Sequence, residues 1–204
     1  MKRAWEIFRQ VQEKRPLVQC ITNFVTVNDC ANMILAAGGS PSMAHDIREA
    51  AEAAAAASVL VCNLGAIGDT DAMEAAGKAA NLLGIPVVFD PVAAGGTSLR
   101  RAESARLMRA VHFSVIRGNA SEIRFLAGEQ SSGSGVDAGV FDEITEENLS
   151  AAIGIVKGLA EKTGSVIAVS GRLDLISDSR RTAVLRNGSP VMARITGSGC
   201  MLTA

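Results

Sequence analysis

The chain has 204 residues, of which 48% are apolar and 20% charged, enough apolar material for one domain with a single buried core. The formal net charge is −1, from 20 basic and 21 acidic residues. This balance argues against nucleic acid or an anionic membrane as the partner and favours a small molecule.

The cysteine pattern argues against structural zinc, because the four cysteines include no C-x-x-C pair and only two histidines are available. The basic N-terminus is followed by a mixed amphipathic stretch, whereas a signal peptide would have an apolar core there. We therefore expect a reduced, cytoplasmic protein without a membrane segment.

Short apolar runs alternate with Ala-rich and Leu-rich segments along the chain. The runs predict buried strands at residues 17–21, 59–62, 86–89, 114–116 and 166–169. The segments predict crossover helices at residues 47–57, 72–83, 102–111 and 147–162. This alternation is typical of an α/β domain with a mostly parallel sheet flanked by helices.

The pattern changes towards the C-terminus. Residues 182–186 and 191–195 are predicted to be two strands joined by a turn at Asn187-Gly188, which favours positive φ. We expect this antiparallel hairpin at one edge of the sheet. The Gly- and Ser-rich residues 129–142 are predicted to form a mobile loop.

A glycine-rich turn at residues 196–200 follows the predicted hairpin and opens a last helix. Gly197 and Gly199 would let the backbone approach a ligand, and free N–H groups there would suit a phosphate. An ordinary strand-to-helix turn is the alternative. Cys200 could act as a base towards a substrate hydroxyl, or it could be a buried packing residue.

Charged groups follow two predicted neighbouring strands. Asp90 ends one strand, and the next brings Arg117 and Glu122 to the same edge, where ligands bind in open α/β sheets. Phosphoryl transfer needs acids to hold hydrated magnesium and a cation for the phosphates. The alternatives are a loop cap for Asp90 and a first-turn helix acid for Glu122.

Two further candidates lie near the N-terminus. Asn23 follows the first strand in a group of amides that need partners if they are buried. Met43 lies on a loop marked by glycine and proline, where it could cover a flat, sulfur-containing heterocycle. Core packing is the more frequent role of methionine.

Taken together, these motifs resemble hydroxyethylthiazole kinase, a member of the ribokinase-like superfamily. The matching stretches are Ile21-Thr22-Asn23, Gly39-Ser40-Pro41-Ser42-Met43-Ala44, Asp90-Pro91-Val92, Ile116-Arg117-Gly118-Asn119-Ala120-Ser121-Glu122-Ile123 and Thr196-Gly197-Ser198-Gly199-Cys200-Met201-Leu202-Thr203. The glycine motif by itself is generic to ribokinase-like enzymes, whereas a cysteine after its last glycine, with a Ser-Pro-x-Met loop upstream, is much more specific to the thiazole kinases.

The resemblance implies transfer of the ATP γ-phosphate to the hydroxyl of 4-methyl-5-(2-hydroxyethyl)thiazole, with Mg2+, in thiamine biosynthesis or salvage. It also implies a homotrimer with active sites between protomers. The implied roles are catalysis for Cys200, thiazole contact for Met43, Gly197 and Asn23, ATP contact for Arg117 and Ser170, and magnesium binding for Asp90 and Glu122.

The chain departs from the family pattern at three points. Arg172 replaces an acid in Ser170-Gly171-Arg172-Leu173-Asp174, and Ala94 stands where glycine is common. The family also continues past the cysteine with further helices. We therefore expect residues 1–204 to be a single ribokinase-like domain that lacks its C-terminal helices.

Two other functions stay open from the sequence. One is a kinase of the same fold for a different alcohol, such as hydroxymethylpyrimidine; Cys200 and the Met43 loop argue against it. The other is a non-catalytic protein that binds thiazole or nucleotide.

Overall fold

Eight strands form one sheet in the order β2-β1-β3-β4-β5-β6-β7-β8 in a computed structural model that describes residues 2–129 and 143–204. The strands from β2 to β6 in this order pair in parallel, whereas β7 pairs antiparallel with β6 and β8. The bounds are β1 Leu17–Ile21, β2 Ser40–Ser42, β3 Val59–Asn63, β4 Val87–Asp90, β5 Val115–Asn119, β6 Val166–Ser170, β7 Asp174–Ser177 and β8 Thr182–Leu185.

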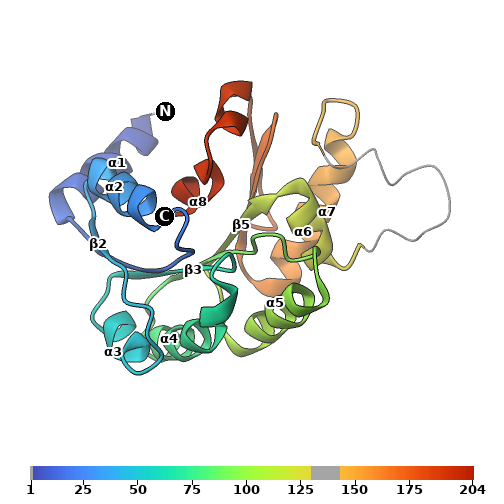
Figure 1. Ribbon diagram of the computed structural model, residues 1–204. Helices are drawn as coiled ribbons and strands as arrows, with labels where there is room; N and C mark the ends of the chain where they lie inside the picture. The colour runs from blue at the N-terminus through green and yellow to red at the C-terminus, as the bar shows by residue number, and fades with distance from the viewer. Residues whose placement is uncertain (1, 130–142) are drawn as a thin grey trace.

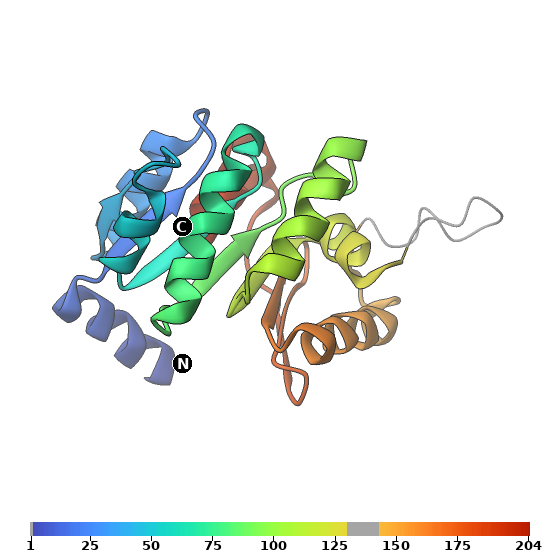
Figure 2. The ribbon, with the colours of Figure 1, turned by 90° about the horizontal axis from the view of Figure 1, so that it is seen from below.

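Helices cover both faces of the sheet. In Figure 1, α1, α2 and α8 lie above the sheet, and α3, α4 and α5 lie below it; Figure 2 shows these last three helices from below. The bounds are α1 Lys2–Lys14, α2 Val27–Ala37, α3 Ala50–Ala55, α4 Thr70–Leu82, α5 Ser98–Ala110, α6 Ala120–Ala127, α7 Leu149–Thr163 and α8 Ser198–Thr203, with short 3-10 helices η1 Ile67–Asp69 and η2 Pro190–Arg194.

The two faces bury two separate apolar clusters. The larger contains buried side chains of the strands together with residues of α3 to α7, and within it Phe89 stacks on Phe113 with ring centroids 4.6 Å apart. The smaller consists of Val18, Cys20, Ile34 and Val61. Because both faces are covered, the parallel strands are apolar runs rather than alternating patterns.

The chain reverses its direction of travel across the sheet after β2. From β1 it crosses through α2 to β2 on one side, and from β2 it returns through α3 to β3 on the other side of β1. The carboxyl ends of β1 and β3 therefore flank a topological switch point, which is where open α/β sheets bind their ligands.

The structure confirms the mostly parallel sheet, its flanking helices and an antiparallel hairpin at one edge. It corrects the members of that hairpin, which are β7 and β8, with β8 beginning at the predicted residue 182. Gly188 does have a positive φ of 100°. The chain then enters η2 instead of a second strand, because Pro190 lacks the N–H that a sheet needs and suits a first helical position.

Most of the segment predicted as a mobile loop, residues 130–142, lies outside the described residues. Within the described part of the chain, no helix is long and apolar enough to cross a membrane.

Candidate active site

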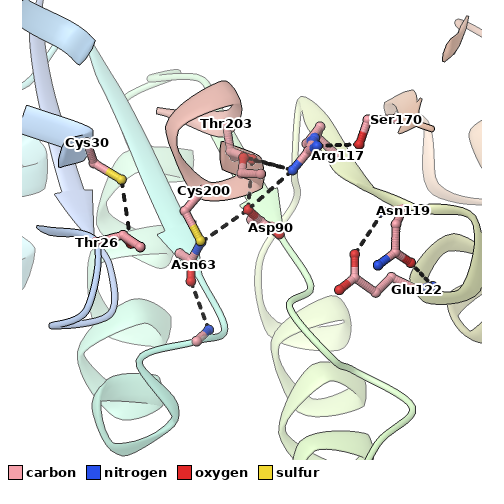
Figure 3. A network of polar contacts seen from close by, with 12 residues as sticks. Thr26, Cys30, Asn63, Asp90, Arg117, Asn119, Glu122, Ser170, Cys200 and Thr203 are labelled. Carbon is pink, nitrogen blue, oxygen red and sulfur yellow. Dashed lines mark hydrogen bonds and ion pairs between the residues drawn. The ribbon is translucent and has the colours of Figure 1, made fainter. Parts of the chain in front are cut away.

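Polar side chains gather where the parallel strands end. Asn23 follows β1, Asn63 ends β3, Asp90 ends β4, Arg117 lies on β5, and Ser170 ends β6. Helix α8 lies across these ends and brings its own polar groups to them (Figure 3). The structure thus brings the predicted carboxylate, cation and cysteine to one edge of the sheet.

Asp90 is the most buried of the predicted site residues, with 2% of its surface exposed. Its Oδ2 accepts hydrogen bonds from Asn63 Nδ2 at 3.1 Å and from Thr203 Oγ1 at 2.8 Å, and Arg117 Nη1 lies 3.8 Å away. Burial raises the pKa of Asp90 to about 6, against the lowering effect of Thr203, Arg117 and Asn63.

All of these protein donors meet the same oxygen of Asp90. Among the described residues, none donates a hydrogen bond to Oδ1. A buried carboxylate with one satisfied oxygen and one free oxygen is oriented by the protein and still able to bind a ligand. The loop-cap alternative for Asp90 does not match this environment, because its partners come from β3, β5 and α8.

Glu122 has a clear local role at the start of α6. Its Oε2 accepts the backbone N–H of Asn119 at 2.8 Å, while Asn119 Oδ1 accepts the N–H of Glu122, which is a capping box. Its Oε1 accepts the N–H of Ala93 at 2.9 Å in the loop after β4. Glu122 is therefore a first-turn helix acid, which was the alternative role expected from the sequence. Its carboxylate also connects the start of α6 to the loop after β4.

The two carboxylates bear on the magnesium prediction. Asp90 and Glu122 lie close enough for the charge of Glu122 to raise the pKa of Asp90. Within the described ranges there is no group of three acidic, histidine or cysteine side chains that could enclose a metal ion. The two carboxylates of Asp90 and Glu122 fit hydrated magnesium, because proteins hold this ion with one or two carboxylates and leave its other positions to water and phosphate oxygens.

Arg117 joins three elements of the site. Its Nη1 donates to the carbonyl of Gly199 at 2.8 Å and to Thr203 Oγ1 at 3.4 Å, and its Nη2 donates to Ser170 Oγ. Its Nε is buried and has no hydrogen-bond partner among the described residues. The two residues predicted to contact ATP are thus adjacent, and the guanidinium fixes the glycine-rich helix α8 to the strand ends.

The glycine-rich turn packs closely against the loop after β1. Gly197 has a φ of 75°, and a Cβ built there would lie 2.1 Å from Thr26 Cγ2. Only glycine fits, because both the left-handed backbone and the missing space exclude a side chain. This contact sets the distance between the start of α8 and the loop that carries Asn23.

Asn23 is the partner of Cys200. Its Nδ2 lies 3.5 Å from Cys200 Sγ and 3.3 Å from Asn63 Oδ1, and its Oδ1 accepts from the backbone N–H and the hydroxyl of Thr26. Cys200 is half-buried, whereas the other three cysteines are buried and free. Its sulfur is therefore within reach of both an amide donor and the ligand side of the sheet.

Met43 lies apart from this hydrogen-bonded group. It is half-buried and packs against the smaller apolar cluster, the role that the core-packing alternative describes. Gln19, which is fully buried, holds the loop by donating its Nε2 to the carbonyl of Ala44. A thiazole contact of Met43 stays a prediction.

Asn63 and Thr203 belong to this hydrogen-bonded group and were not predicted as site residues from the sequence. Asn63 ends a buried strand just as Asp90 does, so the same positional signal was present. For Thr203, the only signal in the sequence was a hydroxyl group one turn after the glycine motif. Its part depends on α8 folding back over β4, with a bond between residues 113 positions apart.

The hydroxyethylthiazole kinase family model matches residues 8–204. The chain belongs to this family. It is 48% identical over 201 residues to hydroxyethylthiazole kinase of Desulfovibrio desulfuricans, covering 98% of this chain and 70% of that protein. It is 46% identical over 200 residues to the enzyme of the same name from Clostridium beijerinckii, covering 97% and 72%.

Solved structures agree with this assignment. The chain is similar to a hydroxyethylthiazole kinase protein of Pyrococcus horikoshii, with a TM-score of 0.87, 37% identity and coverage of 100% of this chain and 74% of that one. Adenosine kinase from Schistosoma mansoni, in complex with tubercidin, has a TM-score of 0.51 at 11% identity over 95% of this chain and 66% of that one. The latter likeness concerns the fold alone, which is ribokinase-like.

Proposed function

We propose that this kinase transfers the γ-phosphate of ATP to the hydroxyl of 4-methyl-5-(2-hydroxyethyl)thiazole, a step in thiamine biosynthesis and salvage. Membership of the hydroxyethylthiazole kinase family supports the reaction and the substrate over the hydroxymethylpyrimidine alternative. The observation that carries the proposal is the continuous polar network from Cys200 through Asn23 and Asn63 to Asp90. It connects the proposed base to the proposed metal side.

In the proposed reaction the substrate hydroxyl oxygen attacks the γ-phosphorus. A new oxygen–phosphorus bond forms, the bond from the γ-phosphorus to the bridging oxygen breaks, and ADP leaves with that electron pair. Cys200 receives the hydroxyl proton, and Asn23 orients the sulfur through its amide N–H. Backbone N–H groups at the glycine-rich turn, held by Arg117, face the transferred phosphoryl group.

We assign the thiazole side to Asn23, Gly197 and Met43, and the ATP side to Arg117 and Ser170. A thiol is a poor base near neutral pH, so Cys200 supplies a modest share of the rate. Positioning and charge neutralisation supply most of it, as in other phosphoryl transfers.

Asp90 and Glu122 would hold Mg2+ on the nucleotide side. The free Oδ1 of Asp90 and the remaining lone pairs of Glu122 are suitable oxygen donors. Bound there, Mg2+ would supply positive charge that offsets the negative charge of the phosphates.

We further propose a homotrimer located in the cytoplasm. Phe24 and Val25, in the loop that carries Asn23, are 89% and 57% exposed, which suits contact with another protomer. Four free cysteines suit a reducing compartment. Sedimentation should give a species about three times the 21.1 kDa chain mass, and a monomer at all concentrations would contradict the trimer.

The reaction is tested by ADP release from the purified chain with magnesium-ATP. We expect release with 4-methyl-5-(2-hydroxyethyl)thiazole and none with 4-amino-5-hydroxymethyl-2-methylpyrimidine. Cys200→Ala should slow release without abolishing it, and chelation of magnesium should stop it. Turnover only with the pyrimidine would favour the sister kinase, and thermal stabilisation by thiazole without turnover would favour a binding protein.

A further inference from the structure

Asn63 occupies the junction between the two sides of the proposed reaction. It is 1% exposed at the end of β3. Its Nδ2 donates to Asp90 Oδ2 at 3.1 Å, and its Oδ1 accepts from Asn23 Nδ2 at 3.3 Å and from the Gly65 N–H at 2.9 Å. The Nδ2 of Asn63 thus contacts the proposed magnesium ligand Asp90, and its Oδ1 contacts Asn23, which is assigned to the thiazole.

The orientation of this amide follows from the chemistry of its partners. The Gly65 N–H can only donate, so it requires the carbonyl oxygen of Asn63, and the ionised Asp90 can only accept, so it requires the NH2 group. A flipped amide would lose both bonds. Since these neighbours impose opposite demands, the side chain has a single satisfied orientation.

The position of Asn63 in the sheet explains how one side chain contacts both Asn23 and Asp90. Asn23 follows β1 and Asp90 ends β4, and β3 lies between these strands. The bond from Asn63 to Asn23 spans the switch point, while the bond to Asp90 spans the neighbouring strand pair. One buried side chain therefore fixes two functional groups that the backbone sets two strands apart.

The loop after β3 is built around this amide. A Cβ at Gly65 would lie 2.6 Å from Asn63 Oδ1 and 2.9 Å from Asn23 Nδ2. Glycine at this position lets the loop backbone pass close to both amides and donate its N–H to one of them. The close approach leaves no room for Asn63 to change its side-chain conformation.

We propose that Asn63 is a positioning residue for phosphoryl transfer, which holds the Asp90 carboxylate and the Asn23 amide at a fixed separation. This role rests on the proposed function, since it assigns Asp90 to magnesium and Asn23 to Cys200 and the thiazole. Asn63 leaves Oδ1 of Asp90 free for the ligand by occupying Oδ2 together with Thr203.

Two variants separate the two ends of Asn63. Asn63→Ala removes the contacts to both Asp90 and Asn23, whereas Thr203→Val removes a donor from Asp90 and leaves the bond between Asn63 and Asn23 intact. Asn81→Ala is the matched control, because Asn81 also makes two hydrogen bonds, both to the backbone of His112, outside the active site. Urea unfolding of all three gives the stability against which activity is compared.

The kinetic outcome should differ between the variants. We expect Asn63→Ala to lower kcat by about ten- to one-hundred-fold, as loss of a partner of a metal ligand does, and to raise KM for the thiazole. Thr203→Val should lower kcat without changing that KM, and Asn81→Ala should change neither. In an Asp90→Asn background Asn63→Ala should have a much smaller effect on kcat, because coupled residues are not additive.

A second readout uses the ligand-free chain. The side-chain carbon signal of Asp90 in NMR reports its pKa, and both Asn63→Ala and Thr203→Val should raise that pKa by removing a donor. The other groups that face Asp90 are unchanged in both variants: Arg117 from β5, Glu122 from α6 and Cys20 from β1.

The proposal is overturned if Asn63→Ala keeps kcat within twofold of the original chain. It also fails if the loss is the same with and without Asp90, or if the pKa of Asp90 does not rise. Should the Ala variant not fold, Asn63→Ser gives the same comparison. If the original chain does not phosphorylate the thiazole at all, the proposed function fails, and the NMR titration still shows whether Asn63 holds Asp90.

Discussion

Replacing Gly197 by alanine tests whether the close contact between α8 and the Asn23 loop sets the geometry of the site. The new methyl group would lie 2.1 Å from Thr26 Cγ2 and 3.0 Å from Thr26 Cβ. Thr26 is 2% exposed and is fixed through hydrogen bonds with Asn23, so it has no free space to enter. One of the two segments must move.

The expected loss in the free energy of unfolding of Gly197→Ala has two parts. A residue with a Cβ in the left-handed conformation that Gly197 adopts costs about 1–2 kcal/mol, and forcing an extra carbon into a packed contact costs about 1–3 kcal/mol. Gly197→Ala should therefore lower the free energy of unfolding by roughly 2–5 kcal/mol. It should also lower kcat, because the displaced turn carries the N–H groups assigned to the phosphoryl group.

A double-mutant cycle with Thr26→Ser isolates the steric part. Serine removes Cγ2 and keeps the hydroxyl that bonds to Asn23, so the packing penalty should largely disappear while the backbone penalty stays. Urea unfolding of the four proteins should give a coupling of about 1–2 kcal/mol. An equal loss from Gly197→Ala in both backgrounds would refute the argument that contact with Thr26 requires glycine.

Two further predictions concern stability. Gly77→Ala in α4 should lower the free energy of unfolding by about 1–3 kcal/mol, because its Cβ would lie 2.6 Å from Val111 Cγ2. Gly158→Ala in α7, where no atom of the described residues lies within 4 Å of the new Cβ, should raise it by about 0.4–1 kcal/mol. Equal effects in urea unfolding would contradict this reading of the packing. Burial raises the pKa of Asp90 from 3.8 to about 6, so the folded state binds more protons than the unfolded state between these values and ionised Asp90 lowers stability as pH rises through this window. Asp90→Asn should therefore be more stable at pH 7, by on the order of 3 kcal/mol, with the gain vanishing below about pH 4 and with kcat much reduced but still measurable; unfolding that shows the same difference at pH 4 and pH 7 would contradict it.

Much of the fold followed from local patterns. The apolar runs at residues 17–21 and 59–62 identified buried parallel strands because such runs are short and enclosed on both faces. The hairpin was harder to predict. Residues 174–177 carry a weak apolar pattern and form a strand by pairing with β6 and β8, whereas residues 191–195 look like a strand and follow a proline that favours η2.

Part of the chemistry of the site could also be predicted from the sequence. Asp90 and Arg117 could be placed at the ligand edge because each lies at or near the carboxyl end of a predicted parallel strand. Glu122 was predicted with two possible roles, and the structure shows the helix-capping one through its bonds to Asn119 and Ala93. A capping acid and a ligand acid have the same local sequence.

The sequence by itself determined the α/β class, the edge of the sheet that carries polar groups, and the kinase family through its ordered motifs. These depend on residue types and spacing within segments of a few residues. Only the tertiary structure decided that Asn23, Asn63, Asp90 and Thr203 meet, because strand order and the return of α8 bring together residues from both ends of the chain, with hydrogen bonds between residues 113 and 177 positions apart. Hydrogen bonds between such distant groups leave no periodic signal in the chain, since their partners are selected by packing.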